Sequence, residues 1–237
     1  METAKKPMSV LQEAALLTQQ GEYEEALQKY LWFHKHALEH TPALIGVRLS
    51  FALDGWFELA KKYPKALQAL IDIRDEAANT ATRGQGSLGA FFEAAAINGC
   101  LEEGAKTVAL FKQIRQISPE LAERCYPIAE PYLAANQEYA ICSSYIPDAA
   151  ARFENIRVVY ESGIRVAKAT PEYGDEEPEE FALETFIPSV CRVVEILLGA
   201  GRRPEAEKVR DLALALNANP KTRESLDTIL PAGEPER

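Results

Sequence analysis

A short pattern recurs at two distant points of the chain and constrains its fold more than any other feature. Gly21 is followed at two residues by Tyr23 and at five by Ala26, and Gly201 and Ala206 keep the second of these spacings. Apolar residues on both sides of each glycine fall at three- and four-residue steps, as they do on one face of an amphipathic helix. Each pattern therefore predicts two helices that meet at a glycine turn.

Helical periodicity continues through most of the chain, interrupted by glycine, proline and polar segments. No segment shows the alternation of polar and apolar residues that is typical of a strand. Because helix hairpins of this kind bury their apolar faces against their neighbours, we predict an all-α fold, an α-solenoid of antiparallel helix hairpins. The predicted helices lie at about residues 11–17, 26–40, 42–62, 66–77, 88–97, 101–114, 119–135, 149–169, 181–198, 205–216 and 220–230.

A stack of hairpins has no sharp internal boundary, so the sequence predicts a single domain over residues 1–230 and a disordered tail over 231–237. The longest exposed loop is expected at residues 171–180, which contain six acidic residues and no basic one. These acids are expected to complement the positive end of the following helix. A contact with a metal ion or a basic peptide is the alternative for the same segment.

Charge and composition limit the classes of partner. The chain has 26 Lys and Arg against 36 Asp and Glu, a net charge of -10, and an electrostatic field of that sign repels phosphate backbones and anionic lipids. We therefore expect neither a nucleic acid nor a membrane as partner. Lys5 and Lys6 are not followed by an apolar segment, and the four cysteines form no C-x-x-C pair. A cytoplasmic protein with reduced, buried thiols and no cofactor is expected.

The hairpins resemble tetratricopeptide repeats, in which a turn glycine precedes an aromatic residue by two positions and a small residue by five. Gly21, Tyr23 and Ala26 match this pattern, and Gly201 and Ala206 match it in part, with Arg203 in place of the aromatic residue. Ala66 and Gly104 occupy the small-residue position in two looser units, at a longer spacing than that of the regular repeat. The chain is thus similar to a divergent member of this family.

The resemblance implies a protein or peptide segment bound on a concave face. Family members that hold a carboxylate chain end use Lys, Arg and Asn there, and this chain lacks such a basic clamp. The positions that the resemblance places on the concave face are Leu11, Ala15, Gln19, Arg48, Gly55, Glu58 and Glu93.

All three histidines lie together, and His36, Glu39 and His40 form the H-x-x-E-H pattern of inverted zinc proteases. On a helix, the two histidines share one face and could bind a metal ion with the glutamate as base. The opposing interpretation is structural, because histidines at the carboxyl end of a helix interact favourably with exposed carbonyls and no third ligand is evident.

Residues 84–89 spell the G-x-G-x-x-G pattern of dinucleotide-binding loops. That chemistry requires a strand before the loop, and none is predicted, so we interpret the segment as a connection between hairpins. No other catalytic set stands out. The favoured hypothesis is a non-catalytic adaptor. A metal-dependent hydrolase and a self-associating subunit whose end helices pair with a second copy are the alternatives.

Overall fold

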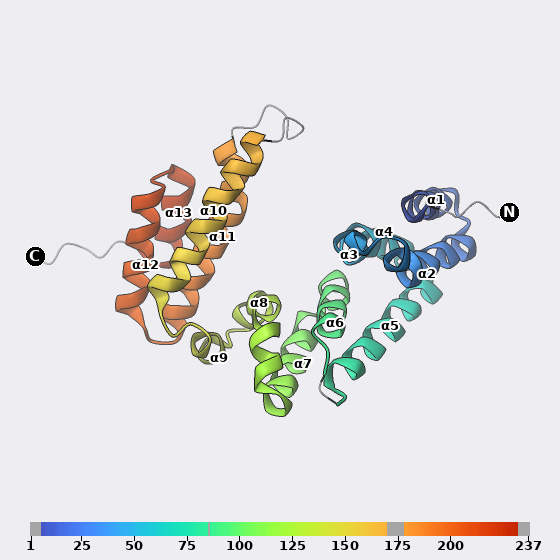
Figure 1. The fold of residues 1–237 in the computed structure, drawn as a ribbon, viewed down its shortest axis with the longest axis horizontal. Coiled ribbons are helices and arrows are strands. Elements are labelled where there is room, and N and C mark those ends of the chain that lie inside the picture. The colour runs from blue at the N-terminus through green and yellow to red at the C-terminus, as the bar shows by residue number, and fades with distance from the viewer. Residues whose placement is uncertain (1–5, 85, 170–177, 232–237) are drawn as a thin grey trace, which may run out of the picture. The chain divides into compact units, whose positions relative to one another are not determined.

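The computed structural model describes residues 6–84, 86–169 and 178–231. These residues form helices joined by short connections and contain no strand, so the prediction of an all-α fold is confirmed (Figure 1). None of the helices in these ranges has both the length and the apolar character needed to cross a bilayer. The predicted acidic loop and tail fall largely on residues 170–177 and 232–237, which lie outside the described residues.

Packing contacts gather in two compact units, residues 1–129 and residues 130–237, and α8 runs across the division. The expected single domain over 1–230 stays a prediction. The first unit contains α1 (Pro7–Gln20), α2 (Tyr23–His40), the 3-10 helix η1 (Pro42–Leu44), α3 (Ile45–Arg48), α4 (Phe51–Ala60), α5 (Pro64–Thr82), α6 (Leu88–Cys100), α7 (Gly104–Ile117) and the start of α8 (Pro119–Ala135).

Helices of the first unit pack mainly against their neighbours in the chain. Contacts join α1 to α2, α4 to α5, α5 to α6 and α6 to α7, and further contacts join α1 to α4 and α4 to α6. Gly21 ends α1 in the left-handed conformation, with φ at 86°, which explains the glycine of the first pattern. Ala26 and Ala66 are completely buried, whereas Gly104 is partly exposed at the first residue of α7.

An aromatic pair forms the centre of the first core. The rings of Tyr30 and Trp56 stack with centroids 5.9 Å apart, and the Trp56 indole N–H donates to the carbonyl of Ala66 at 3.1 Å. Gly55 lies beside this pair, because a Cβ at that position would be 2.7 Å from the Tyr30 hydroxyl. The small residue at position 55 thus makes room for the Tyr30 ring between α2 and α4.

The helix expected at about residues 42–62 is divided into η1, α3 and α4. Leu49 and Ser50 separate the last two, and Ser50 has a non-helical backbone, with φ at -136° and ψ at -98°. Its hydroxyl donates to the carbonyl of Gly46 at 2.8 Å. Periodicity alone does not show this break, because apolar residues keep their helical spacing across it.

The second unit contains α9 (Tyr139–Ser144), α10 (Ala149–Ala169), α11 (Pro178–Gly199), α12 (Arg203–Leu216) and α13 (Pro220–Ile229). Helices α10, α11 and α12 pack against one another, and α9 and α13 both contact α11 (Figure 1). The short α9 was not expected from the sequence. Arg202 anchors the end of α9 and the segment after it, because it donates to the hydroxyl of Ser143 at 3.0 Å and to the carbonyl of Ile146 at 2.6 Å.

Candidate functional site

Two of the residues expected on the binding face, Arg48 and Glu93, are brought together by the fold. The others are not joined to them by any hydrogen bond or ion pair within the described residues. Ala15, Gln19 and Glu58 are exposed. Leu11 is partly buried and packs against the apolar core of the first unit.

Arg48 and Glu93 form a three-residue cluster with His34, which sequence reasoning did not include. The His34 Nε2 and Glu93 Oε1 atoms are 2.6 Å apart, Arg48 Nε donates to the His34 carbonyl at 2.7 Å, and Arg48 Nη2 pairs with the Glu93 carboxylate. The three side chains are 10%, 13% and 19% exposed for His34, Arg48 and Glu93. The cluster links α2, α3 and α6 across 59 residues of sequence.

The hydrogen bonds show how the three side chains of this cluster are paired. Burial raises the pKa of Glu93, but the hydrogen bond from His34 and the charge of Arg48 outweigh it, so its pKa lies below the usual value. When His34 Nε2 carries a hydrogen and donates it to Glu93, it cannot also accept one from Arg48 Nη2, which lies 2.8 Å away. Arg48 therefore donates to the carboxylate. The charges of Arg48 and Glu93 therefore compensate each other inside the fold.

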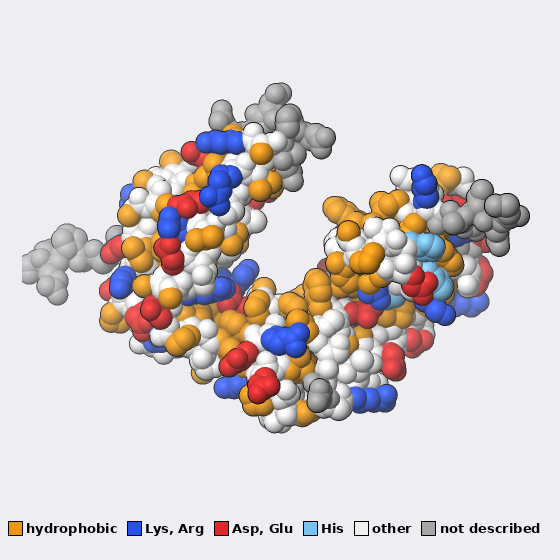
Figure 2. Space-filling view, in the orientation of Figure 1, with side chains coloured by type: hydrophobic (Ala, Val, Ile, Leu, Met, Phe, Trp, Pro, Cys, Tyr) orange, Lys and Arg blue, Asp and Glu red, His pale blue; other side chains and the backbone are white. Residues whose placement is uncertain are grey.

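The exposed face of α4 offers a different chemistry. Phe51 is 75% exposed, and Asp54 and Glu58, three and seven residues further on, are also exposed. This spacing puts the three side chains on one side of the helix. We call this surface the α4 face. Figure 2 shows hydrophobic side chains gathered on α3 and the start of α4, where Ile45 is also exposed.

Phe51 was missed as a candidate, although a signal for it was present. It lies three residues after Arg48 and four before Gly55, both of which were expected on the concave face from the resemblance to tetratricopeptide repeats. Glu58 is among the positions expected on the binding face, and its carboxylate accepts a hydrogen bond from Lys61 at 2.6 Å. Both partners of that pair are more than half exposed, so the pair contributes little and leaves the carboxylate accessible.

The histidines of the H-x-x-E-H pattern lie at the carboxyl end of α2 beside an aromatic ring. His36 Nδ1 is 2.8 Å from Glu39 Oε2, and the Trp32 ring lies 5.4 Å from the His36 ring and 5.9 Å from the His40 ring. The hydrogen bond from His36 lowers the pKa of Glu39. Within the described ranges, no group of three or more His, Cys, Asp or Glu side chains is placed to hold a metal ion. The hydrolase hypothesis therefore gains no support from this geometry.

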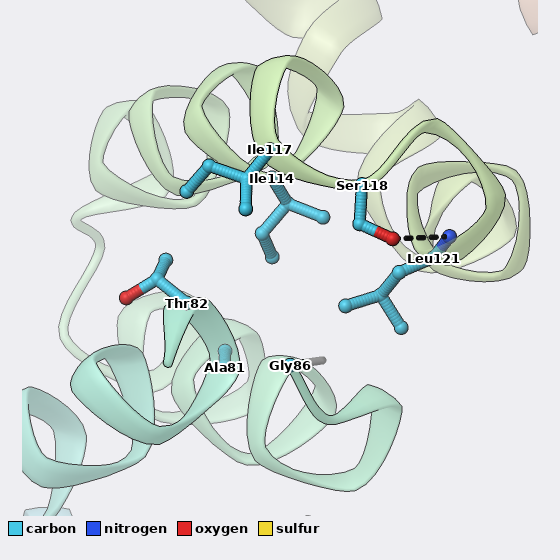
Figure 3. A pocket seen from close by; sticks show the side chains of 7 residues that line it. All are labelled: Ala81, Thr82, Gly86, Ile114, Ile117, Ser118 and Leu121. Carbon is cyan, nitrogen blue, oxygen red and sulfur yellow. Dashed lines mark hydrogen bonds between the residues drawn. The ribbon is translucent and has the colours of Figure 1, made fainter. Parts of the chain in front are cut away.

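The G-x-G-x-x-G segment packs against the start of α8. A Cβ on Gly86 would overlap Leu121 Cδ2 and lie 2.6 Å from the Ala81 carbonyl oxygen, and φ at Gly86 is +70°. Figure 3 shows Ile114 and Leu121 pointing toward this turn, with Ile117 on the side of Thr82. The space between them is about 10 Å³, which holds at most one water molecule. The glycine thus serves close packing between helices.

A wider groove of about 520 Å³ adjoins this contact and is lined partly by Ser118, Glu120 and Arg124 of α8 and the turn before it. The Ser118 hydroxyl accepts a hydrogen bond from the Leu121 amide at 3.4 Å and caps α8 (Figure 3). Glu120 and Arg124 bring charges of opposite sign to the same groove, so its lining favours neither anions nor cations.

The four cysteines, all of which the structure describes, form no disulfide. Burial raises the pKa of Cys100 and of Cys125 to about 11, so neither thiol is activated. Comparison with protein-family models, with curated proteins and with solved structures found no match to this chain.

Proposed function

We propose that this chain is a non-catalytic adaptor, a divergent relative of tetratricopeptide-repeat proteins, that binds a segment of another protein on the α4 face. The observation that carries the proposal is the 75% exposure of Phe51 on the same side of α4 as Asp54 and Glu58. The proposal places the protein in the cytoplasm, with neither nucleic acid nor membrane as partner, in keeping with its net charge of -10.

The chemistry of the α4 face defines the partner. An aromatic side chain is a large apolar surface, and aromatic anchors dominate the binding energy of many protein interfaces. The two carboxylates beside Phe51 favour Lys or Arg on the other side. The expected partner segment therefore carries an apolar side chain that packs on Phe51 and basic side chains within one or two helical turns of it.

The hairpin architecture of the proposal rests on the order of helix contacts in the first unit. From α1 to α7 each helix packs on the next, and α1, α4 and α6 also contact one another in succession. This order is typical of stacked hairpins, in which the first helices of successive units lie side by side. Such stacking leaves one side of α4 without an internal partner, as a binding face requires.

Affinity capture with the full chain tests the proposal. We expect Phe51→Ser and Glu58→Lys to reduce recovery of the same captured protein. The matched control is Ile117→Ser, which removes another exposed apolar side chain, 52% exposed at the end of α7, and should leave recovery unchanged. Equal recovery by all four proteins would remove the α4 face from consideration.

Charge reversal at Glu93 is not a suitable probe of binding. Its carboxylate is paired with Arg48 and His34 inside the fold, so a lysine there would place two cations together at a largely buried site. A loss of binding in that variant would report on folding, whereas Glu58 is exposed and its replacement leaves the core unchanged.

A further inference from the structure

A second groove lies in the unit of residues 130–237, where α10 and α11 run side by side (Figure 1). Its volume is about 150 Å³. Ile156, Tyr160 and Phe186 are buried and contribute its apolar part, and the rings of Tyr160 and Phe186 lie with centroids 4.7 Å apart. Val159, which is 61% exposed, forms part of the rim. This part of the groove suits an apolar group.

One end of the groove is lined by a guanidinium group, that of Arg152. Arg152, which lines the groove, donates from Nη2 to both oxygens of Glu130 at 3.0 Å. Arg192 Nη1 lies 3.9 Å from the same carboxylate, whose side chain is only 3% exposed. Two guanidinium groups thus share one carboxylate, and of the two only Arg152 lines the groove.

Hydrogen-bond donors remain unused at this end. The Arg152 side chain is 33% exposed, and its Nη1 takes part in none of the hydrogen bonds found among the described residues. This N–H group can therefore donate to a ligand in the groove. Asn155, three residues further along α10, is exposed and also lines the groove, which places its amide on the same side of the helix as Arg152.

The hydroxyl groups of Thr185 and Ser189, on the α11 side of the groove, are not available to donate hydrogen bonds to a ligand. Ser189 donates to the carbonyl of Thr185 at 2.7 Å, and Thr185 donates to the carbonyl of Ala182 at 3.2 Å. Their hydrogens are directed into α11, so the donors available to a ligand are those of α10. An anion is therefore expected beside Arg152 and Asn155, with its apolar part toward Phe186.

From these observations we infer that the α10–α11 groove binds a small monocarboxylic acid with an apolar body. The single guanidinium group in the lining matches a monoanion, and the apolar side chains disfavour a fully hydrated ion such as phosphate. A cavity of roughly 150 Å³ accommodates a benzene ring. Benzoate is thus a suitable probe, since its carboxylate and ring have the required size and polarity. This site is independent of the α4 face.

Nuclear magnetic resonance of the ¹⁵N-labelled full chain tests the inference. Benzoate is added at constant ionic strength, with neutral benzamide and inorganic phosphate as separate probes. We expect saturable shifts of amide signals from Asn155, Val159 and Thr185 with benzoate at a Kd of about 1 mM or below, an affinity that a ligand of this size can reach. Neither benzamide nor phosphate should produce saturable shifts at these amides.

Two neighbouring variants give a matched comparison. Val159→Asp places a carboxylate at the groove rim and should weaken benzoate binding at least about tenfold through like-charge repulsion. Val158→Asp adds the same charge at an exposed neighbour that does not line the groove, and should bind more tightly than Val159→Asp. Absence of saturable shifts, equal binding of benzamide, or equal effects of the two variants would overturn the inference.

Discussion

Gly199 at the end of α11 and Tyr139 at the start of α9 lie so close that a Cβ at position 199 would overlap the tyrosine ring, including Cε2 at 2.6 Å. The Tyr139 hydroxyl donates to Glu195 at 2.7 Å, and this hydrogen bond raises the pKa of Tyr139 to about 12. The tyrosine therefore fixes the short helix α9 on α11 through both its ring and its hydroxyl, and the contact requires glycine.

Replacement of this glycine should destabilise the second unit. We predict that Gly199→Ala lowers the free energy of unfolding by about 1–3 kcal/mol, because the added methyl forces the ring and the helix apart. Gly89→Ala is the control, since a Cβ there meets only the Ser87 hydroxyl at 3.8 Å and should stabilise the protein by up to about 1 kcal/mol. Denaturant unfolding measures both, and equal stability of the two variants would contradict the contact.

Alanine substitution at Gly84 and at Gly86, the two glycines before α6, should lower the free energy of unfolding by different amounts. Both have a positive φ, so an alanine at either is expected to cost about 1 kcal/mol in backbone strain. Gly84 has no atom within 4 Å of its added Cβ, whereas Gly86 meets Leu121 and the Ala81 carbonyl. Gly86→Ala should therefore cost about 1–3 kcal/mol more than Gly84→Ala in thermal or denaturant unfolding. The reverse order would show that the turn does not pack on α8 as described.

The Glu93 carboxylate should make the free energy of unfolding decrease at low pH. Its pKa is lowered in the folded protein relative to an unfolded value of about 4.3, so its contribution is complete above that pH. The contribution is lost as the pH falls from there through the folded pKa. Glu93→Gln should therefore flatten the decline in unfolding free energy below about pH 4.3. An unchanged acid slope in this variant would show that the carboxylate is not held in the cluster.

Thiol chemistry gives a simple check of burial. With pKa values of about 11, Cys100 and Cys125 are almost entirely protonated near neutral pH. We predict slow alkylation of both residues by iodoacetamide at pH 7.5 in the native protein and rapid alkylation in guanidinium chloride. Mass spectrometry of the labelled peptides measures each site. Rapid native labelling of Cys125, which is fully buried, would contradict the packing of α8.

Local sequence patterns predicted the helices and the glycine turns, because periodicity and a left-handed conformation depend on residues close in the chain. Gly21 and Gly201 both have a positive φ. The patterns did not predict the His34 cluster, since His34 meets Glu93 only after α2, α3 and α6 have packed. The six-residue α9 was missed because such a segment is too short to show a helical period. The chemistry of the α10–α11 groove likewise depends on tertiary packing.

The affinity of the captured partner segment for the purified chain tests the adaptor function most directly. Isothermal titration calorimetry would compare the unaltered protein with Phe51→Ser and with the Ile117→Ser control. Loss of an exposed aromatic anchor should weaken binding by at least about tenfold, while the control binds as the unaltered protein does. Equal affinity of Phe51→Ser and the unaltered protein would contradict binding on the α4 face.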